Sequence, residues 1–600
     1  MDEILKLLQK TGTALCRLPG DALVWGIFSD PVKILTAHNV AEVAPLLTEL
    51  EEALAAGCFA AGFISYEAAA AFDSAFHVCP CADFPAACVA VYAKAPECLT
   101  AFPDAEETSN LFFEPEINRQ EYSEALKRIG RDIGDGNIYQ ANFTFRTHAP
   151  TVAEPEKLFL SLVKRHPVPY PAFFNVGEFK ILSISPELFL ERAGRRVKSS
   201  PMKGTVKRHP IAAQDKAVTE WLASDPKNMA ENLMITDMVR NDFGRFCEPG
   251  SILADPLFQV DTYHTVHQMI STVRGDVADG KTLQDILRAA FPPASITGAP
   301  KISAMNIICR EEKSPRNVYT GAMGCFMPGG DFCLNVAIRT LICSADRTEL
   351  GIGSGIVYDS NADAEWQEAL LKGRFINYSI PEFQTLETML WEKQGGIKYF
   401  AEHMARAEAT QRYFGRNWNR AAIDKALSAA AEKVCQEELE QARLRLLIAA
   451  DGSADAEVTP LTAAWWGKPS IRVLVSDAKV DSHDVFLYHK TTNRDFYNRH
   501  FHDAQENGFD EVIFFNERDE LTEGAISNIF LRYDQQWFTP PLSSGLLPGI
   551  WREKMILELK AVEKVTYLEY LKDADEIVLG NSVRGKAVVG DIVYQQSNIN

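Results

Sequence analysis

The stretch SIPEFQ, residues 379–384, divides the chain into two parts. Pro381 interrupts the helical pattern that leads up to it, because the residue before a proline is biased away from the helical conformation. A new pattern then begins with the strand-like TLETML. We therefore expect a first domain of residues 1–378, a linker of residues 379–384 and a second domain of residues 385–600. Each part is long enough for a hydrophobic core of its own.

The composition is that of a soluble globular protein. Of the 600 residues, 46% are hydrophobic and 24% are charged, and no apolar run is long enough to span a membrane. The N-terminal MDEILKLLQKTG is amphipathic and lacks the apolar core of a signal peptide. The net charge of -20 disfavours nucleic acid as a partner but leaves room for small anionic substrates. The scattered cysteines, which form no pair of CxxC motifs, predict reduced thiols and a cytoplasmic protein.

Two predicted helices of the first part carry acidic residues whose role the pattern leaves open. Residues 225–243 form one helical pattern, with Asp225 as its N-cap and Glu231 in its second turn. In the other, Glu368 and Lys372 are four residues apart and therefore share a face. A solvated helix surface is the simplest interpretation of such residues. Carboxylates from two helices would also suit Mg2+, which takes one or two protein carboxylates and leaves positions for substrate oxygens.

Further motifs follow one another through the first part. They are GDGNIYQANFT (134–144), SISPELFLER (183–192), PMKGT (201–205), AENLMITDMVRND (230–242), PPASITGAPK (292–301), NVAIRT (335–340), GIGSGIVYDS (351–360) and EWQEALLKGR (365–374). In this order they resemble the chorismate-utilising family of anthranilate, aminodeoxychorismate, isochorismate and salicylate synthases. The resemblance is strong over residues 119–378 and weaker before them. It implies an α/β sandwich of antiparallel sheets with surrounding helices, in an α+β protein of two domains.

The resemblance also implies roles for individual residues. Glu231 and Glu368 match Mg2+ ligands, and the metal would hold the ring carboxylate of chorismate as a Lewis acid. Glu187 matches a general acid that protonates the departing C4 hydroxyl, for which burial should raise the pKa of its carboxyl. The residues that match substrate contacts are Gln140, Thr297, Arg339, Gly353, Ser354, Gly355 and Lys372.

Two positions distinguish the reactions within this family. Gln140 stands where isochorismate and salicylate synthases carry a lysine that activates water, and its amide cannot act as a base. Lys203 stands where anthranilate synthases usually carry alanine. In aminodeoxychorismate synthases, such a lysine resembles a nucleophile that displaces the C4 hydroxyl and is then displaced by ammonia. This role requires a neutral amine, so a neighbouring cation or a dry site must lower the pKa of the lysine. A lysine that only binds a carboxylate is the alternative.

The chain departs from the family pattern in two respects, and it also shows no source of ammonia of its own. Gln268 stands where the family usually has histidine, and His267 lies one place earlier. Near the N-terminus, WGIFSDP stands in place of a serine-containing strand. No nucleophilic cysteine with a downstream catalytic histidine is recognisable, so the chain shows no glutaminase of its own. The implied partner is a separate glutamine amidotransferase subunit that supplies ammonia, with free ammonia as the alternative.

The second part contains the components of a pyridoxal-phosphate site. YHKTTNRDFY (488–497) is predicted as a strand that ends in a polar turn, and GLLPGIWRE (545–553) opens a helix whose N-terminus suits an anion. With HMARAEATQRYFG (403–415) and ELTEGAISNIF (520–530), these stretches resemble the fold-type IV family over residues 383–593. That family includes branched-chain and D-amino-acid aminotransferases and 4-amino-4-deoxychorismate lyase. A homodimer through this domain is one arrangement that the resemblance allows.

In this second family, Lys490 matches the Schiff-base lysine and Glu523 matches the carboxylate that pairs with the pyridine nitrogen. Thr388 matches a threonine that assists proton transfer in the lyases. The remaining matches to cofactor contacts are Arg406 and the amides of Ile550 and Trp551 for the phosphate, with Asn581 and Ser582 closing the pocket.

The fusion of the two parts favours one pair of activities. Amination of chorismate to 4-amino-4-deoxychorismate supplies the substrate for elimination of pyruvate, which gives 4-aminobenzoate. An anthranilate- or salicylate-type synthase fused to an aminotransferase is the alternative, and Lys203 and Gln140 disfavour it. A catalytically inactive scaffold is a third reading, which the intact set of candidate residues disfavours.

Overall fold

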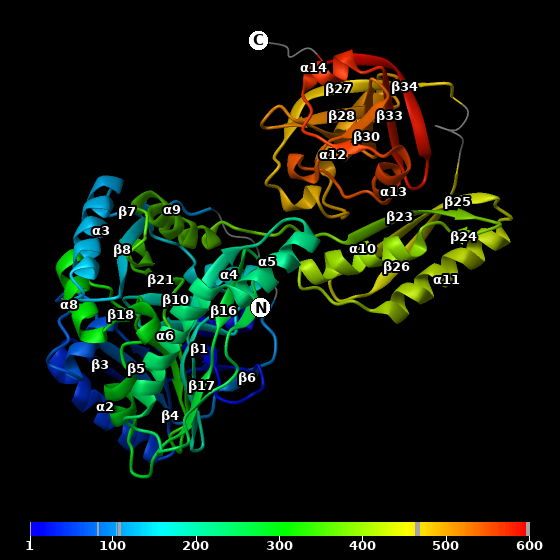
Figure 1. Cartoon of the computed structure of the whole chain (residues 1–600). Helices are drawn as coiled ribbons and strands as arrows, with labels where there is room; N and C mark the ends of the chain where they lie inside the picture. Colours follow the sequence, from blue (N-terminus) through cyan, green and yellow to red (C-terminus); the bar gives the residue numbers. More distant parts are fainter. Residues whose placement is uncertain (1, 81–82, 104, 106–109, 462–467, 596–600) are drawn as a thin grey trace. The chain divides into compact units, whose positions relative to one another are not determined.

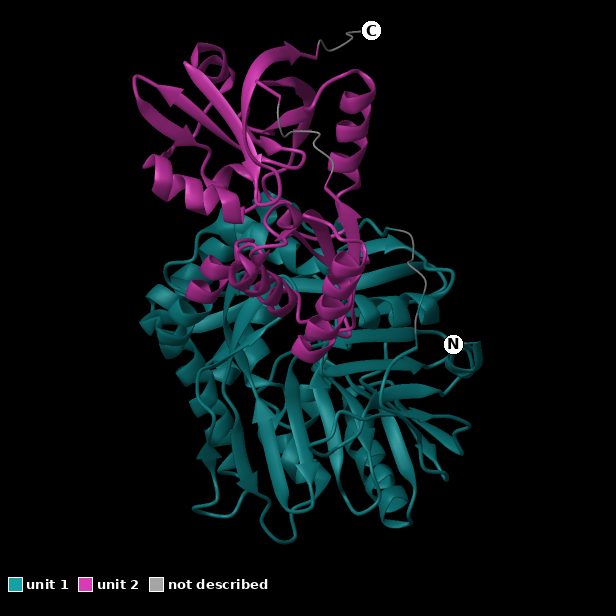
Figure 2. Cartoon of the chain, turned by 90° about the vertical axis from the view of Figure 1, so that its right-hand side faces the viewer, with its two compact units in different colours: residues 1–207, 219–380 teal, residues 208–218, 381–600 magenta. Residues whose placement is uncertain are grey.

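The computed structural model describes residues 2–80, 83–103, 105, 110–461 and 468–595. The chain forms two compact units, coloured separately in Figure 2. The first unit consists of residues 1–207 and 219–380, and the second of residues 208–218 and 381–600. The units therefore separate within the SIPEFQ stretch. The second unit also contains residues 208–218, a segment that the expected domain boundaries did not assign to it.

The first unit is built on two large antiparallel sheets (Figure 1). One has the order β18 (Gly298–Ala299), β8 (Gln140–Pro150), β22 (Arg347–Ile356), β21 (Thr340–Cys343), β10 (Lys180–Ser185), β9 (Tyr170–Asn175), β1 (Ala14–Arg17), β2 (Trp25–Phe28) and β6 (Glu97–Leu99), and β7 (Glu114–Pro115) pairs with β8. The other has the order β14 (Leu253–Ala254), β17 (Val273–Asp276), β12 (Arg196–Ser200), β11 (Leu188–Ala193), β20 (Phe332–Val336), β19 (Ala322–Phe326), β4 (Phe59–Ile64), β5 (Ala87–Tyr92) and β3 (Lys33–Ala37). Phe174 of the first sheet and Phe63 and Met323 of the second belong to one buried cluster, so the sheets pack face to face.

Helices cover the outer face of each sheet, because each helix presents one apolar side to it. Those packed with the sheet that contains β8 are α1 (Asp2–Leu8), α3 (Arg119–Gly134), α4 (Pro155–Arg165), α8 (Lys301–Glu311) and α9 (Ala362–Gly373). Those packed with the sheet that contains β11 are α2 (Val40–Ala55), α6 (Pro226–Phe243) and α7 (Leu283–Ala290). The predicted sandwich of antiparallel sheets with surrounding helices is confirmed.

A small third sheet completes the first unit. It consists of β13 (Met202–Lys207), β16 (Val266–Ile270) and β15 (Gln259–Thr262). After β13 the chain enters the second unit, and α5 (Ala212–Ser224) carries it back into the first. The next helix, α6, has the predicted N-cap, since the Asp225 carboxylate accepts a hydrogen bond of 2.9 Å from the Asn228 N–H.

The second unit has one small and one large sheet. The small sheet has the order β24 (Gly396–Ile397), β23 (Thr385–Glu392), β25 (Gln441–Ile448) and β26 (Ala454–Pro460), and α10 (Phe400–Tyr413) and α11 (Arg420–Gln436) pack on it. The large sheet has the order β29 (Leu521–Gly524), β28 (Glu511–Asn516), β27 (Ile471–Val480), β34 (Gly585–Tyr594), β33 (Glu576–Asn581), β30 (Asn528–Tyr533), β31 (Gln536–Thr539) and β32 (Val562–Glu563). Its helices are α12 (Asp495–Glu506), α13 (Ile550–Leu559) and α14 (Leu568–Asp573). The strand predicted at TLETML is present as β23, and the helix predicted to open at GLLPGIWRE is present as α13.

One prediction in this unit is wrong. Residues 488–497 do not form a strand: a single isolated bridge joins Thr491 to Thr385, and α12 begins at Asp495. Polar side chains in this stretch bond to the local backbone instead, as when the Thr491 hydroxyl accepts a 3.2 Å hydrogen bond from the Asn493 N–H. Lys490 therefore lies in irregular backbone between structured elements. In the described part of the chain, no helix is both long and apolar enough to cross a membrane.

Two candidate active sites

Lys203, on β13, is the centre of the first candidate site. Its ammonium nitrogen lies 3.4 Å from Oδ1 of Asn142 on β8. Burial, together with the positive charge of Lys372, lowers the pKa of Lys203 to about 8. The carboxylates close enough to oppose this shift are Glu187, Glu231 and Glu368. Folding has therefore placed side chains from several separate elements around one amine.

Glu187 lies in the short connection between β10 and β11 and is almost fully buried. Burial raises the pKa of its carboxyl to about 7, while Ser295, Lys203 and the Met202 N–H favour the charged form. Its Oε1 is 3.4 Å from that N–H. A carboxyl that is partly protonated near neutrality thus lies beside an amine that is partly neutral, which is the state that the roles expected for Glu187 and Lys203 require.

The backbone of β22 approaches β8 too closely for side chains at two of its positions. A Cβ on Gly353 would lie 2.3 Å from the Phe143 carbonyl oxygen, and one on Gly355 would lie 2.4 Å from Nε2 of Gln140. The Lys372 ammonium donates a 3.0 Å hydrogen bond to the Gly353 carbonyl, and it also pairs with the Glu368 carboxylate at 2.8 Å. The pair that the spacing predicted on α9 is therefore formed.

The polar side chains of three predicted substrate contacts, Gln140, Thr297 and Ser354, differ in their hydrogen-bond partners within the protein. Oε1 of the buried Gln140 has no hydrogen-bond partner in the described part of the chain. The Thr297 hydroxyl instead donates to carbonyls of its own turn at 3.2 and 3.3 Å, and its carbonyl accepts a 2.8 Å hydrogen bond from the Asn142 N–H. The Ser354 hydroxyl lies 3.1 Å from that of Tyr122. An unpaired buried amide oxygen is costly, so Gln140 is the member of this set that most needs a ligand.

Arg339 is a further predicted contact in an unusual setting. Its backbone has a φ of 48°, in the left-handed region that is rare for residues other than glycine. Desolvation lowers the pKa of its guanidinium, and the Tyr263 hydroxyl is the neighbour that opposes this. No carboxylate pairs with Arg339 among the residues that the structure describes. A desolvated guanidinium without such a partner suits an anionic ligand.

The acidic residues around Glu231 fit a divalent cation. Glu231 is half-buried on α6, and burial raises the pKa of its carboxyl. The nearby carboxylates of Asp359 and Glu365 raise it further, while Lys203 and Lys227 lower it. Bound Mg2+ would relieve this repulsion, and carboxylate oxygens are the ligands it prefers. Glu231 and Glu368 are the residues that would hold it.

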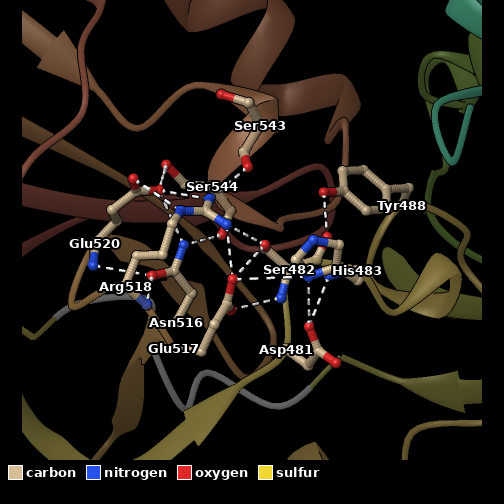
Figure 3. A network of polar contacts seen from close by, with 10 residues as sticks. All are labelled: Asp481, Ser482, His483, Tyr488, Asn516, Glu517, Arg518, Glu520, Ser543 and Ser544. Atoms are coloured by element: carbon tan, nitrogen blue, oxygen red, sulfur yellow. Dashed lines mark hydrogen bonds and ion pairs between the residues drawn. The ribbon is translucent and has the colours of Figure 1, made fainter. Parts of the chain in front are cut away.

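A second acidic group, in the other unit, does not fit a metal. Asp481, His483 and Glu517 are close enough to share an ion, but all three are exposed. Figure 3 shows that Glu517 is already engaged in a network with Ser482 and Arg518. Its pKa lies at about 2 because hydrogen bonds from Ser482 and the charge of Arg518 outweigh desolvation. The group is therefore a structural network.

His267 and Gln268, where the sequence departs from the expected family pattern, are neighbours in β16. In β16, His267 and Gln268 pair with consecutive residues of β13, so their side chains point to opposite faces of the sheet. The imidazole of His267 is buried and lies 2.9 Å from the Thr262 hydroxyl. His267 therefore cannot present its imidazole on the face of the sheet toward which Gln268 points.

The second candidate site is a cavity of 630 Å³ in the second unit. All the residues that the sequence assigned to a pyridoxal-phosphate site line it: Thr388, Arg406, Lys490, Glu523, Ile550, Trp551, Asn581 and Ser582. Burial, together with the charges of Arg494 and Arg406, lowers the pKa of Lys490 to about 7. A substantial fraction of the Lys490 amine is therefore neutral near pH 7.

Glu523 is an acidic residue that lines this cavity. Burial raises the pKa of its carboxyl to about 8, against the stabilising effect of the Leu547 N–H, which donates to Oε1 at 3.1 Å. The Asn528 side chain donates to the other oxygen at 3.0 Å. Asn528 is in turn packed against Gly549, where a Cβ would lie 1.9 Å from its Oδ1. Glu523 is therefore fixed in place, and a bound cation such as a pyridinium would favour its charged form.

Arg406 lies where α13 begins. Its Nε and Nη2 donate to the two oxygens of Glu387 at 2.9 and 2.7 Å, and Nη1 donates to the Pro548 carbonyl at 3.3 Å. This pairing outweighs desolvation and holds the pKa of Glu387 at about 2. The first amides of α13, those of Ile550 and Trp551, also border the cavity. A helix N-terminus beside an oriented guanidinium is suited to a phosphate group.

Both parts of the chain match models of known protein families. Residues 20–378 match the model of chorismate binding enzymes. The chain belongs to this family. Residues 384–592 match the model of class IV amino-transferases, which agrees with the lysine-containing cavity of the second unit.

Relatives of the chorismate-binding part carry two different names. The chain is 35% identical over 270 residues to aminodeoxychorismate synthase component 1 of Escherichia coli (strain K12), which is 45% of this chain and 60% of that protein. It is 37% identical over 276 residues to anthranilate synthase component 1 1 of Haloarcula marismortui, which is 46% of this chain and 56% of that protein. The chain thus spans little more than half of these relatives. Anthranilate synthase component I from Streptococcus pneumoniae TIGR4 has the same fold over 62% of this chain and 93% of its own, with a TM-score of 0.53 at 24% identity.

Some residues at these sites were not assigned from the sequence. Asn142 contacts Lys203 and donates a 2.8 Å hydrogen bond to the Ser295 carbonyl, and Asn232 donates 3.2 Å hydrogen bonds to the Lys203 and Met269 carbonyls. Glu387 holds Arg406 in the second site. Asn142 and Asn232 lie inside quoted motifs, and their burial as polar residues was the available signal.

Proposed function

We propose that this chain makes 4-aminobenzoate from chorismate and ammonia in two steps, one in each unit. The first unit replaces the C4 hydroxyl of chorismate by an amino group, and the second eliminates pyruvate from the aminated product. The observation that carries the proposal is Lys203, a buried amine with a lowered pKa beside the protonatable Glu187. An alanine at this position would offer no nucleophile.

In the first step, Lys203 attacks the chorismate ring as a neutral amine, and the C4 hydroxyl leaves as water with the proton of Glu187. Ammonia then bonds to C4, and the bond to Lys203 breaks, which restores the lysine. Arg339, Lys372 and the backbone of β22 bind the carboxylates of the substrate. Mg2+ held by Glu231 and Glu368 would supply a Lewis acid for the ring carboxylate.

In the second step, the cavity around Lys490 binds the aminated product. Arg406 and the first amides of α13 would hold the phosphate of pyridoxal phosphate, and Glu523 would pair with its ring nitrogen; when bound, the cofactor would supply an electron sink. Lys490 takes the proton from C4 of the ring. As the ring becomes aromatic, the C3–O bond breaks, and Thr388 and Lys490, which both line the cavity, would return a proton to the enolpyruvyl group, which leaves as pyruvate.

The likeness to a relative named component 1 supports a separate amidotransferase as the source of ammonia. All cysteines in the described segments are free thiols, which supports a cytoplasmic location. A homodimer through the second unit remains part of the proposal.

Incubation of the full chain with chorismate, ammonium, Mg2+ and pyridoxal phosphate tests the proposal, with the products identified by mass. We expect 4-aminobenzoate and pyruvate in equal amounts, and 4-amino-4-deoxychorismate when pyridoxal phosphate is omitted. Formation of 2-aminobenzoate would instead assign the first unit to the anthranilate synthase reaction. An amino-group exchange with a 2-oxo acid, without pyruvate release, would assign the second unit to the aminotransferases.

A further inference from the structure

A segment that precedes the second unit by more than 160 residues in sequence forms part of it. Residues 208–218 belong to the second compact unit, although both of their flanking regions belong to the first. The segment follows directly after β13, the strand that carries Lys203. We call residues 208–218 the docked segment.

A buried ion pair holds the docked segment in shape. The Arg208 guanidinium donates to Asp215 Oδ2 from Nε at 3.0 Å and from Nη2 at 2.6 Å, and the His209 N–H donates to Oδ1 at 2.8 Å. The third arm of Arg208, Nη1, donates to the Tyr413 carbonyl at 2.7 Å. The guanidinium carbon also lies 3.7 Å from the centre of the Tyr413 ring. Arg208 and Asp215 are both buried, so these contacts are screened little by solvent.

The docked segment contacts the residue next to the candidate cofactor lysine. Nε2 of His489 lies 3.0 Å from the Pro210 carbonyl oxygen, and Nδ1 lies 3.2 Å from the Thr410 hydroxyl. Burial lowers the pKa of His489 to about 4, and the charge of Arg208 contributes. The imidazole is therefore neutral, with Nε2 as the donor to Pro210 and Nδ1 as the acceptor from Thr410. Both ring nitrogens are used to fix one residue beside Lys490.

The apolar side of the docked segment supports the residues just before His489. Ile211 is buried in one cluster with Leu487 and Tyr488. On its other side, Tyr488 donates a 2.8 Å hydrogen bond to the Ser482 carbonyl, within the network of Figure 3. The backbone that leads to Lys490 is thus supported from two directions, by this network and by the docked segment.

Lys490 depends on such support because its backbone lies outside the sheets. Its carbonyl accepts a 2.9 Å hydrogen bond from the Leu386 N–H, the Thr492 N–H donates one of 2.9 Å to the Gln384 carbonyl, and an isolated bridge joins Thr491 to Thr385. This short pairing holds the backbone after Lys490, so the irregular backbone before it is positioned mainly by its side-chain packing. A shift of His489 would therefore be passed directly to the next residue in the chain.

We propose that the docked segment positions Lys490: Pro210 and Ile211, held by the Arg208–Asp215 pair, fix His489 and Tyr488 and thereby the direction in which the lysine enters its cavity. This inference rests on the proposed cofactor role of Lys490. It assigns to residues of the chorismate-binding sequence a positioning role in the second reaction. The second unit would then be incomplete if the chain were cut at Pro381.

The test uses the full chain loaded with pyridoxal phosphate, and it reads the circular dichroism of the bound cofactor in the visible range together with the rate of pyruvate release. The variants are Ile211→Ala, the milder Ile211→Val and His489→Leu, with His489→Gln to restore a donor to the Pro210 carbonyl. Gln214→Ala, at an exposed position of the same segment, is the control. Formation of 4-amino-4-deoxychorismate is measured in parallel.

We expect the visible dichroism to decrease in the order wild type, Ile211→Val, Ile211→Ala, because the orientation of the cofactor becomes less well defined. The kcat of pyruvate release should fall about tenfold in Ile211→Ala and His489→Leu with little change in KM, since a small misplacement of a reacting group is costly. His489→Gln should recover most of both signals, and Gln214→Ala and the first reaction should be unchanged.

Wild-type dichroism and wild-type kcat in both Ile211→Ala and His489→Leu would overturn the positioning role. Loss of signal in His489→Gln equal to that in His489→Leu would also contradict it, because the donor would then be irrelevant. A wild-type chain that binds pyridoxal phosphate without a visible signal from a lysine-bound cofactor would overturn the proposed function of the second unit itself, which is a distinguishable result.

Discussion

Each unit contains a buried lysine whose lowered pKa leaves part of its amine neutral near neutral pH, and the two lysines have different surroundings. In both Lys203 and Lys490, burial is the main cause of the lowered pKa, which reaches about 8 in the first and about 7 in the second. Lys203 has the cation Lys372 nearby, whereas Lys490 lies near the guanidinium groups of Arg494 and Arg406. Each is also near carboxylates that oppose the shift. Burial therefore increases the neutral fraction of each amine, and the charged neighbours determine which chemical groups can bind beside it.

The neighbours differ in their own protonation. Glu187, beside Lys203, has its pKa raised to about 7, so it can supply a proton. Glu387, near Lys490, is held at about 2 by Arg406 and stays a carboxylate. In the second site burial also raises the pKa of Glu523, to about 8, so the two sites differ less in having an acid than in the fixed charges of Arg406 and Glu387, which suit an anionic cofactor. The predictions below test whether these two sites act separately.

The largest effect is expected for Lys490→Ala. Pyruvate release should fall at least about a thousand-fold, because the variant loses both the cofactor attachment and the proton acceptor. The first reaction should continue, so that 4-amino-4-deoxychorismate accumulates, because Lys203 and Lys490 belong to different compact units. The measurement is product analysis by mass together with the visible absorbance of the bound cofactor. Lys572→Ala, at an exposed lysine of the same unit, is the control.

If the Lys490 variant is folded but forms no 4-amino-4-deoxychorismate, the two sites are coupled. If it forms 4-aminobenzoate at the wild-type rate, the cofactor assignment of Lys490 is wrong.

For Lys203→Ala, we expect the first reaction to be lost and the second to be kept. Amination at C4 should fall about a hundred-fold or more, because a methyl group cannot replace a nucleophile. The second reaction, assayed with supplied 4-amino-4-deoxychorismate, should be unchanged. Lys207→Ala, at an exposed position of the same strand, provides the matched control. Wild-type amination by the Lys203 variant would exclude the covalent role and leave the carboxylate-binding alternative.

A smaller effect is expected on the metal requirement, which only the first unit should have. Glu231→Gln and Glu368→Gln should each raise the Mg2+ concentration for half-maximal amination about tenfold or more, since an amide is a poorer ligand for a hard cation than a carboxylate. Asp237→Asn, an exposed change on the same helix as Glu231, serves as the control. Superimposable Mg2+ titrations for both glutamine variants and the wild type would place the metal elsewhere.

The smallest effect concerns pH. The first reaction requires neutral Lys203 and protonated Glu187, so kcat/KM should be greatest between about pH 7 and 8. Below this range Lys203 becomes protonated, and above it Glu187 loses its proton, so activity should fall about tenfold per pH unit on each side. Glu187→Gln should remove the alkaline limb from the residual activity. An alkaline limb that persists in this variant would mean that another group supplies the proton.

The sequence predicted the local structure well where the signal lies within one element. Asp225 caps α6 as expected, and Glu368 and Lys372 form the pair that their spacing implies, because an N-cap and an i, i+4 pair depend on residues a few positions apart. The prediction of a strand around Lys490 was wrong, because the Thr491 side chain bonds to the local backbone and the next helix begins at Asp495. The residue roles at both sites, by contrast, came from the family resemblance and not from these patterns.

What the sequence by itself determined is the two-part organisation, the types of secondary structure and the residue types available for chemistry. Tertiary structure decided which of those residues meet: Lys203 and Glu187 come together only because the small sheet with β13 lies against the connection between β10 and β11. It also decided their pKa values, since these depend on burial and on charges from distant elements. The membership of residues 208–218 in the second unit was likewise set by long-range packing around Arg208 and Ile211, for which no local sequence pattern exists.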